Sequence, residues 1–246
     1  MEKVKFILED EVARVILNRP EKKNALNEQV LNELREAIDL VKESSAKVLV
    51  LSGEGDTFCS GLDRELLMNL TQKGSFGDQE LTSLIEFVQN LIYDIRTLKI
   101  PVIAAVQRYA IGGGMQLALA ADIRIATPGT IFWLREPEFG IIPDMGALQI
   151  LPKLVGDGIA REIVFTRRKV TAEEGKMIGL VNEIYENLEN GIKEYVQKLI
   201  SVPSYTLAEA KMVMERSWHL SLKDSFKENR DAQVRCIRET IRKFKS

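Results

Sequence analysis

The sequence predicts an α/β protein that continues into a helical C-terminal region. Up to about residue 185, short apolar strands alternate with amphipathic helices, an order typical of an α/β core. From about Asn190 onward the pattern is helical, with acidic and basic residues interleaved. The length of 246 residues suits one domain, or one domain with an appendage.

The first half is expected to hold a hairpin, two helices and two buried strands. Residues 4–8 and 12–17 alternate apolar and polar side chains, as paired strands do, and Asn18-Arg19-Pro20 ends the second run. Asn27 suits the N-cap of an amphipathic helix. The other elements expected here are a buried strand over 48–51, an amphipathic helix over 80–98 and a strand over 102–106.

The second half is expected to continue the alternation. Its predicted elements are a strand over 123–126 and helices over 147–151, about 157–165 and 172–178. Asp157 suits the N-cap of the second of these helices, and Thr171 with Glu174 forms a capping box that opens the third. The polar segment 70–80 contains two glycines, which makes it the best candidate for a mobile loop.

Composition argues against several classes of protein. The net charge of −2 and the pI near 5.7 do not suggest a nucleic-acid surface, and the most apolar run is broken by Asp122 and Arg124, which excludes a membrane span. Cys59 and Cys236 are too few for a disulfide framework, and with His219 as the single histidine no zinc or other metal site is expected. The charged start of the chain lacks a signal peptide, which favours a cytoplasmic protein.

The segment 100–152 carries the clearest chemical signal. An apolar strand leads into three consecutive glycines, Gly112–Gly114, at the start of a helix. Such glycines allow backbone N–H groups to point at an anion or oxyanion, although three glycines alone are more often a tight turn. Glu136 and Asp144 follow in loops, where acidic side chains could transfer protons beside an oxyanion hole.

Four segments in order together resemble the crotonase (enoyl-CoA hydratase/isomerase) superfamily. They are LNRPEKKNALN (17–27), FCSGLDRELL (58–67), IPVIAAVQRYAIGGGMQLALAADIRIA (100–126) and FGIIPDMGALQILPKLVG (139–156). The resemblance implies a spiral of repeated β-β-α units with an acyl-CoA site over residues 1–188. It also implies that the helical region 189–246 serves oligomerisation, as a homotrimer or homohexamer, and that the substrate is a coenzyme A thioester.

By the same resemblance, the backbone N–H groups of Leu62 and Gly113 form an oxyanion hole for the thioester oxygen. The resemblance also places a group of residues along the path of coenzyme A: Ala25, Ser60, Gly61, Asp63 and Gly112. Coenzyme A enters as part of the substrate, and no separate cofactor is implied. Preorganised donors of this kind stabilise an enolate, and the removal of one typically costs about 2.7–4 kcal/mol.

One departure from the family pattern bears on the reaction. Hydratases of the family use two glutamates, and the corresponding positions here are Gln116 and Glu136. Glutamine hydrogen-bonds water but cannot take its proton, so hydration by two carboxylates is not expected. A single glutamate suffices to isomerise a 3-enoyl thioester to the 2-enoyl form, with Gln116 orienting substrate or water. The alternatives are a weakened hydratase, an acyl-thioester decarboxylase and a non-catalytic acyl-CoA binder.

Other residues carry two interpretations each. Asp144 lies where some family members with non-hydratase chemistry have a catalytic aspartate, but it also suits the N-cap of the next helix. Trp133 would reshape the acyl pocket if it points inward, and otherwise packs in the core. Cys59 favours a small buried residue over a reactive thiol, and His219 favours a surface or interface position over a catalytic one.

Overall fold

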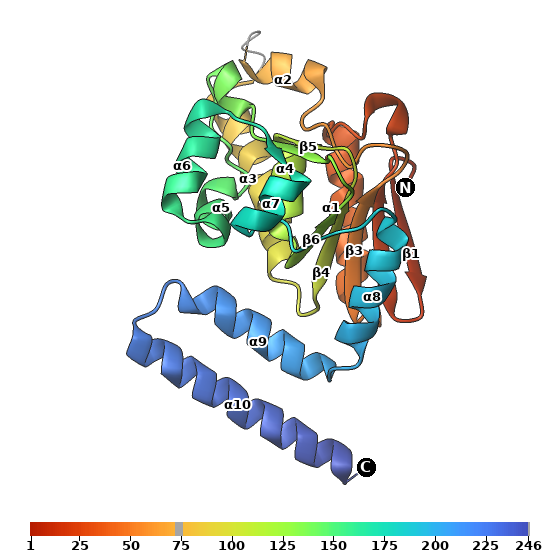
Figure 1. Ribbon diagram of the computed structural model, residues 1–246, viewed down its shortest axis with the longest axis vertical. Helices are drawn as coiled ribbons and strands as arrows, with labels where there is room; N and C mark the ends of the chain where they lie inside the picture. The colour runs from red at the N-terminus through yellow and green to blue at the C-terminus, as the bar shows by residue number, and fades with distance from the viewer. Residues whose placement is uncertain (72–75, 246) are drawn as a thin grey trace.

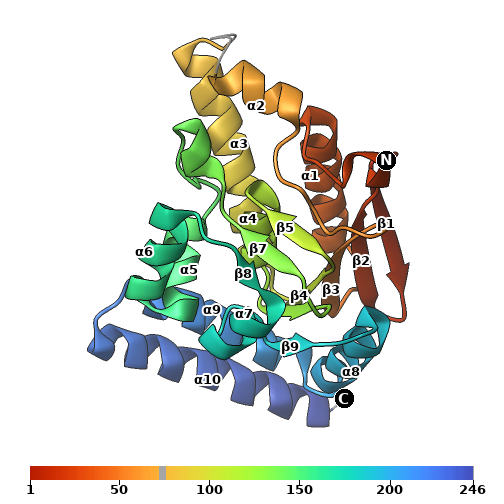
Figure 2. The same cartoon turned by 45° about the horizontal axis from the view of Figure 1, so that its top comes forward.

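The computed structural model describes residues 1–71 and 76–245 and has two sheets surrounded by helices (Figures 1 and 2). The strands are β1 Val4–Glu9, β2 Val12–Leu17, β3 Val48–Gly53, β4 Val102–Val106, β5 Tyr109–Ile111, β6 Ile123–Ala126, β7 Ile131–Trp133, β8 Val170–Thr171 and β9 Glu183–Ile184. The α-helices are α1 Glu28–Glu43, α2 Arg64–Thr71, α3 Asp78–Arg96, α4 Gly113–Ala120, α5 Ala147–Val155, α6 Asp157–Thr166, α7 Ala172–Ile178, α8 Leu188–Ile200, α9 Ser204–Ser217 and α10 Leu222–Phe244. Two short 3-10 helices are η1 Pro20–Lys22 and η2 Glu136–Phe139.

The larger sheet has the strand order β1-β2-β3-β4-β6-β9, and the smaller one has the order β5-β7-β8. The predicted β1–β2 hairpin is confirmed as an antiparallel pair, whereas β2, β3, β4, β6 and β9 run parallel. Consecutive strands pass from the larger sheet to the smaller one, β4 to β5 and then β6 to β7, and α4 connects the two pairs. This repeated β-β-α arrangement agrees with the predicted fold class.

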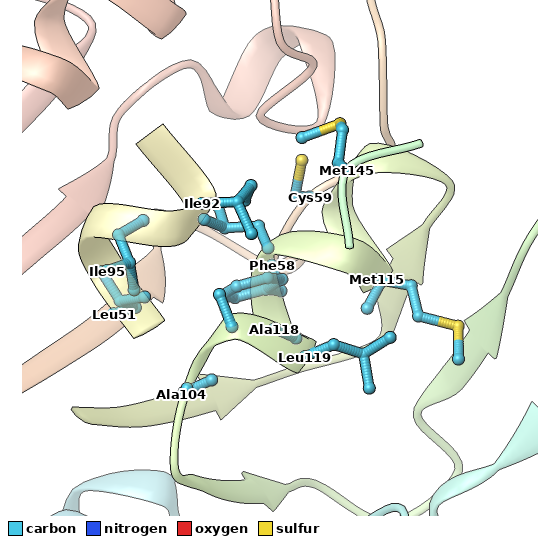
Figure 3. Packing of buried hydrophobic residues seen from close by; sticks show 14 of the residues in the cluster. Leu51, Phe58, Cys59, Ile92, Ile95, Ala104, Met115, Ala118, Leu119 and Met145 are labelled. Carbon is cyan, nitrogen blue, oxygen red and sulfur yellow. The ribbon is translucent and has the colours of Figure 1, made fainter. Parts of the chain in front are cut away.

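Strands β3 and β4 are buried on both faces, which explains their continuous apolar runs. One face of β3, with Leu49 and Leu51, packs in the main core beneath α1, α3 and α4. Figure 3 shows Leu51 in this core, close to Ile95 of α3. The alternate residues, Val48 and Val50, face α8 on the opposite side of the sheet.

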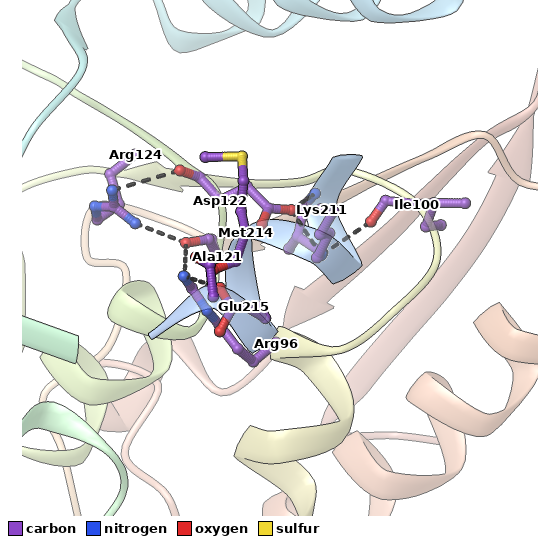
Figure 4. Close-up of polar contacts among 10 residues, drawn as sticks. Arg96, Ile100, Ala121, Asp122, Arg124, Lys211, Met214 and Glu215 are labelled. Carbon is purple, nitrogen blue, oxygen red and sulfur yellow. Dashed lines mark hydrogen bonds and ion pairs between the residues drawn. The ribbon is translucent and has the colours of Figure 1, made fainter. Parts of the chain in front are cut away.

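Helices α9 and α10 lie side by side and extend beyond the sheets (Figure 1). A polar cluster attaches α9 to the body: Lys211 Nζ donates to Asp122 Oδ2 at 2.7 Å and to the Ile100 carbonyl at 3.1 Å (Figure 4). Arg96 of α3 pairs with Glu215 in the same cluster. The outer face of α10 exposes a row of apolar side chains: Leu222, Phe226, Val234, Ile237, Ile241 and Phe244. The predicted division at residue 188 falls at the start of α8, which packs on the sheet.

The helix caps agree with the sequence at two positions and differ at one. Asn27 and Thr171 are N-caps, because their side chains accept hydrogen bonds from the backbone N–H groups of Val30 and Glu174. The prediction for Asp157 is wrong: Gly156 is the N-cap, and Asp157 begins α6 with its carboxylate accepting from Arg161. A φ of +83° at position 156 suits glycine and places the aspartate inside the first turn.

The predicted mobile loop over 70–80 falls partly on helical residues. Helix α2 continues to Thr71 and α3 begins at Asp78, so both ends of the segment are helical. Residues 72–75 lie outside the described residues. Within the described part of the chain, no helix is both long and apolar enough to cross a membrane.

Candidate active site

A cavity of about 630 Å³ opens between the segments that the sequence singled out. Eight of the ten predicted site residues line it: Ala25, Ser60, Gly61, Leu62, Asp63, Gly112, Gly113 and Glu136. Gln116 and Asp144 do not line this cavity. The fold therefore brings together the candidate oxyanion hole and Glu136, which lies more than 70 residues after Leu62 in the chain.

Backbone pairing brings the two candidate oxyanion donors to one place. Residues 59–62 run beside β5, with Cys59 N donating to the Tyr109 carbonyl and Ile111 N donating to the Cys59 carbonyl, both at 3.0 Å. The Leu62 and Gly113 N–H groups donate to no other described residue. Since both residues line the cavity, these two donors remain available to a ligand oxygen.

Two glycines are needed for this close approach. Gly61 has a φ of +91°, and a Cβ there would lie 2.6 Å from the Ile111 carbonyl oxygen. Gly112 has a φ of +52°, and a Cβ there would lie 3.2 Å from Glu136 Oε1. A larger residue at either position would strain the backbone and displace a wall of the cavity. Helix α4 begins at the next residue, Gly113, so the positive end of its dipole faces the same space.

Two acidic residues line the cavity: Asp63, which pairs with Arg19, and Glu136, which is the more deeply buried. Glu136 lies in η2, is 8% exposed and accepts a hydrogen bond from Gln116 Nε2 at 2.7 Å through Oε1. Its other oxygen, Oε2, is buried and has no partner among the described residues. Burial raises the pKa of the Glu136 carboxyl above its usual value, and the charge of Asp144 adds to the rise, while the Gln116 hydrogen bond opposes it. A buried carboxylate with one free oxygen is suited to accepting a proton from a ligand.

Gln116 is buried behind Glu136 and contacts the protein rather than the cavity. It is 1% exposed, and its Oε1 accepts from Met145 N at 2.8 Å and from Ala147 N at 3.3 Å. Because the oxygen is used by two backbone donors, the amide nitrogen must face Glu136. Gln116 therefore fixes the orientation of the Glu136 carboxylate and ties it to the start of α5. The sequence had predicted a contact with substrate or water instead.

Asp144 lies in a different environment. It lines a second cavity, of about 610 Å³, between α3, α5 and α9. Burial raises the pKa of its carboxyl. The N-cap of α5 is Gly146 and no side chain caps that helix, so the interpretation of Asp144 as its N-cap is wrong. Asp144 does not line the cavity that Glu136 lines, and the residue after it is held to Gln116 through Met145 N.

Trp133 neither enters the cavity nor packs in the core. Its Nε1 donates to the Arg167 carbonyl at 2.6 Å, and the cations of Arg135 and Lys169 both lie over its ring, each 4.6 Å from the centroid. Both sequence interpretations of Trp133 are therefore wrong. The ring instead supports Arg135, which lines the catalytic cavity.

Basic residues in the cavity wall are the functional candidates that sequence reasoning missed. Lys22, Arg64 and Arg135 all line the cavity. Lys22 and Arg64 lie inside segments that carry the family resemblance, and Arg135 directly precedes Glu136. These sequence positions were the signal that could have identified them. Their charges make this cavity suitable for a ligand that carries phosphate groups.

Cys59 and His219 have the positions that the sequence favoured. Cys59 is fully buried, its Sγ donates to the Asn24 carbonyl at 3.1 Å, and burial raises its pKa to about 12, so it is an inert thiol. His219 is exposed at the end of the α9 segment, away from the catalytic cavity. Among residues 1–71 and 76–245, no cluster of three acidic, histidine or cysteine side chains could hold a metal ion.

Comparisons with known proteins agree with this geometry. The enoyl-CoA hydratase/isomerase family model matches residues 8–245. YngF of Bacillus subtilis is 39% identical over 177 residues, which are 71% of this chain and 66% of that protein, just under two thirds of its length. The peroxisomal Delta(3,5)-Delta(2,4)-dienoyl-CoA isomerase of Arabidopsis thaliana is 32% identical, covering 86% of this chain and 80% of the isomerase.

A solved structure extends the similarity to the whole fold. The Thermobifida fusca protein described as an enoyl-CoA hydratase, in complex with acetoacetyl-CoA, superposes with a TM-score of 0.86 at 28% identity. The superposition covers 97% of this chain and 96% of that one. The family match over nearly the full length and the shared fold give the same answer. The chain is a member of the enoyl-CoA hydratase/isomerase family, within the crotonase superfamily.

Proposed function

We propose that the protein is an enoyl-CoA isomerase that moves a double bond of an acyl thioester from the 3,4 to the 2,3 position. The observation that carries this proposal is one buried carboxylate, Glu136, paired with an amide, Gln116. An amide cannot accept a proton from water, so the pair supplies one base where a hydratase needs two groups. A double-bond shift needs only one base that removes a proton and returns it elsewhere.

The proposed reaction uses the geometry in the following way. The thioester oxygen accepts hydrogen bonds from the N–H groups of Leu62 and Gly113. Glu136 removes a proton from C2, and the negative charge spreads over the dienolate and onto the oxygen in the hole. The protonated Glu136 then delivers the same proton to C4, which leaves the double bond between C2 and C3. The raised pKa of Glu136 supports this role, because it reduces the difference in pKa between the Glu136 carboxyl and the C2–H group of the substrate, which favours proton transfer.

The coenzyme A part of the substrate is assigned to the basic wall of the cavity. Lys22, Arg64 and Arg135 supply cations there, and their chemistry suits the phosphate groups of coenzyme A. Arg135 is held by Glu138, through Nε at 2.9 Å and Nη2 at 2.7 Å, and by the ring of Trp133. The acetoacetyl-CoA bound to the Thermobifida fusca relative supports a ligand of this class.

The test is a spectroscopic assay with 3-enoyl-CoA substrates of short and medium chain length, following growth of the conjugated 2-enoyl thioester. Wild type is expected to form the conjugated product, and a turnover in D₂O is expected to retain unlabelled protons at C4, because Glu136 carries the proton between carbons. Formation of 3-hydroxyacyl-CoA from 2-enoyl-CoA at a higher rate would favour a hydratase. Absence of any product across the series would contradict the proposal and favour decarboxylation or ligand binding alone.

A second candidate is isomerisation of a 3,5-dienoyl thioester, in which two carboxylates act on a longer conjugated system. The observations in its favour are the charge of Asp144, which acts on Glu136 and raises the pKa of that carboxyl, and the similarity to a dienoyl-CoA isomerase. Asp144→Asn separates the candidates. It should reduce turnover of a 3,5-dienoyl-CoA strongly if Asp144 is a second base, and leave turnover of a 3-enoyl-CoA nearly unchanged.

The assembly and location stay predictions. The exposed apolar row on α10 supports burial against further copies of the chain, as a homotrimer or homohexamer. Light scattering of the purified protein would measure the number of copies. A cytoplasmic location is also retained as a proposal, and its support is the small number of cysteines.

A further inference from the structure

Two cavities of similar volume lie on either side of the loop that precedes α5. The catalytic cavity measures about 630 Å³ and the second cavity about 610 Å³, and no described residue lines both. The second cavity has apolar side chains from three helices: Ile92 of α3, Ile150 of α5 and Met212 of α9. Charged and polar side chains such as Arg216 and His219 complete its lining. It is therefore able to accept an apolar chain.

Met145 lies between these cavities. It lines the second one, and its side chain covers Gly113, which lines the first. A Cβ placed on Gly113 would be 3.1 Å from Met145 Sδ and 3.6 Å from its Cε. Figure 3 shows Met145 in the main core, to which Cys59 of the oxyanion-hole segment also belongs. The methionine is 5% exposed, and it thus contributes to the lining of the second cavity while packing against Gly113 in the wall of the first.

The backbone of this partition is fixed, and its side chain is the adaptable part. Met145 N donates to Gln116 Oε1 at 2.8 Å. The next residue, Gly146, has a φ of +95°, which suits glycine, and a Cβ there would be in ordinary van der Waals contact with Ile92 and Ile150, 3.4 Å from each. Methionine has an unbranched side chain with three rotatable bonds and fits irregular spaces at little energetic cost. We therefore expect the Met145 side chain to move, while the backbone of the loop before α5 stays in place.

A substrate held by the oxyanion hole would extend its acyl group toward this methionine. The Gly113 N–H fixes the thioester carbonyl, and the basic residues that line the same cavity hold the coenzyme A end. We propose that Met145 is a movable partition that determines acyl chain length. Short chains end against its thioether, whereas longer chains displace it and place their distal carbons in the second cavity. This inference rests on the proposed acyl-thioester chemistry.

The principal test compares wild type with Met145→Ala on substrates of increasing length. Turnover of 3-enoyl-CoAs with 4 to 12 carbons and binding of the matching saturated acyl-CoAs by calorimetry are both measured. Met145→Ala is expected to raise the ratio of kcat/KM for the longest over the shortest chain by about tenfold or more, the size of effect that a methylene-scale change in an apolar pocket produces. Met177→Ala, an exposed methionine on α7, is the matched control and should leave the ratio unchanged.

A second variant acts in the opposite direction and protects the test against a folding defect. Met145→Phe puts a larger and less flexible ring at the partition, so it is expected to lower the same ratio without weakening binding of butyryl-CoA. Circular dichroism and thermal unfolding establish that each variant is folded. If both variants are folded and bind short acyl-CoAs, but the chain-length ratio stays within twofold of wild type, the partition is wrong and the proposed isomerase stands. If no acyl-CoA binds wild type, the proposed function itself fails.

Discussion

Glu136 and Asp144 are carboxylates only eight residues apart, yet they belong to different regions of the molecule. Glu136 faces the catalytic cavity with one oxygen held by Gln116, while the other has no hydrogen-bond partner among the residues that the structure describes. Asp144 lines the second cavity, beyond the partition formed by Met145. Burial raises the pKa of both, so the electrostatic environment alone does not distinguish them. The difference lies in their position relative to the oxyanion donors, which determines what each carboxylate can reach.

The largest expected effect tests this comparison directly. Glu136→Gln should lower kcat/KM for a short 3-enoyl-CoA by about 10²–10⁴-fold, because the proton shuttle is lost. Asp144→Asn, the matched change in the second cavity, should alter kcat/KM for the same substrate by less than about threefold, which is small compared with the loss of a proton shuttle. Binding of a saturated acyl-CoA, measured by calorimetry, should be similar in both. Equal losses in the two variants would show that the catalytic roles are shared and that the comparison is mistaken.

Gln116→Glu is expected to change the pH dependence of the reaction. The new carboxylate still accepts from Met145 N and Ala147 N, but it no longer donates to Glu136 and adds a like charge beside it. Both changes raise the pKa of Glu136. Since the base must be ionised, the acidic limb of the kcat/KM profile should move to higher pH. The Gln116→Asn variant keeps the neutral amide, and an unmoved limb in Gln116→Glu would refute the assigned contact.

The same variant could also gain a reaction. With carboxylates at both positions 116 and 136, the site would contain the pair that hydration requires. We expect Gln116→Glu to add water to crotonyl-CoA faster than wild type does, with the loss of absorbance of the conjugated thioester as the measurement. If hydration stays at the wild-type level while the pH profile moves, then the amide matters for orienting Glu136 and not for choosing the reaction.

A smaller effect is expected on stability. Burial raises the pKa of Glu136 in the folded state, so between the unfolded and folded pKa values the folded protein binds more protons than the unfolded chain. The free energy of unfolding must therefore fall as pH rises through that interval. Glu136→Gln removes this titration. The free energy of unfolding of the variant, taken relative to that of wild type, should therefore increase from about pH 4 to about pH 7. Urea unfolding of both proteins at both pH values measures this difference. The exposed Glu65→Gln serves as control, and a pH-independent difference would argue against the burial assigned to Glu136.

The smallest expected effect concerns Arg135 in the wall of the catalytic cavity. Trp133→Ala removes the ring that supports Arg135, a contact worth about 0.5–1 kcal/mol at an exposed site. KM for the acyl-CoA should rise by about two- to fivefold, with kcat unchanged. Trp218→Ala is the matched control, because that ring lies under Lys153, outside the catalytic cavity. A fall in kcat without a change in KM would contradict the assignment of Arg135 to the coenzyme A end.

Much of the architecture could be predicted because it depends on local patterns. Asn27 and Thr171 cap their helices, since a cap depends on a side chain and a backbone N–H group three residues apart. The apolar runs of β3 and β4 predicted buried strands, and the alternating residues 4–17 predicted the hairpin. The N-cap of α6 is Gly156, one residue earlier than the predicted Asp157, because Gly156 adopts the conformation that starts the helix.

The sequence predicted most residues of the candidate site but not the contacts between them. The triple glycine and the segment around Leu62 were recognised together through the family resemblance, and the structure brings them to one cavity. The environment of Gln116 was not predictable, because its partners Met145 and Ala147 are about 30 residues away and reach it only through the packing of α5 on α4. Trp133 was misjudged for the same reason, since its position depends on Arg167 and Lys169.

The sequence by itself determined the residue chemistry: glycines where the backbone approaches closely, one glutamate where hydratases have two, and an aspartate eight residues further on. Only the tertiary structure decided that Gln116 orients Glu136, that Asp144 lies in a second cavity, and that Met145 lines this cavity while packing against Gly113. The physical reason is the range of the interactions. Backbone conformation and capping act over a few residues, whereas side-chain direction and cavity boundaries depend on contacts between distant segments.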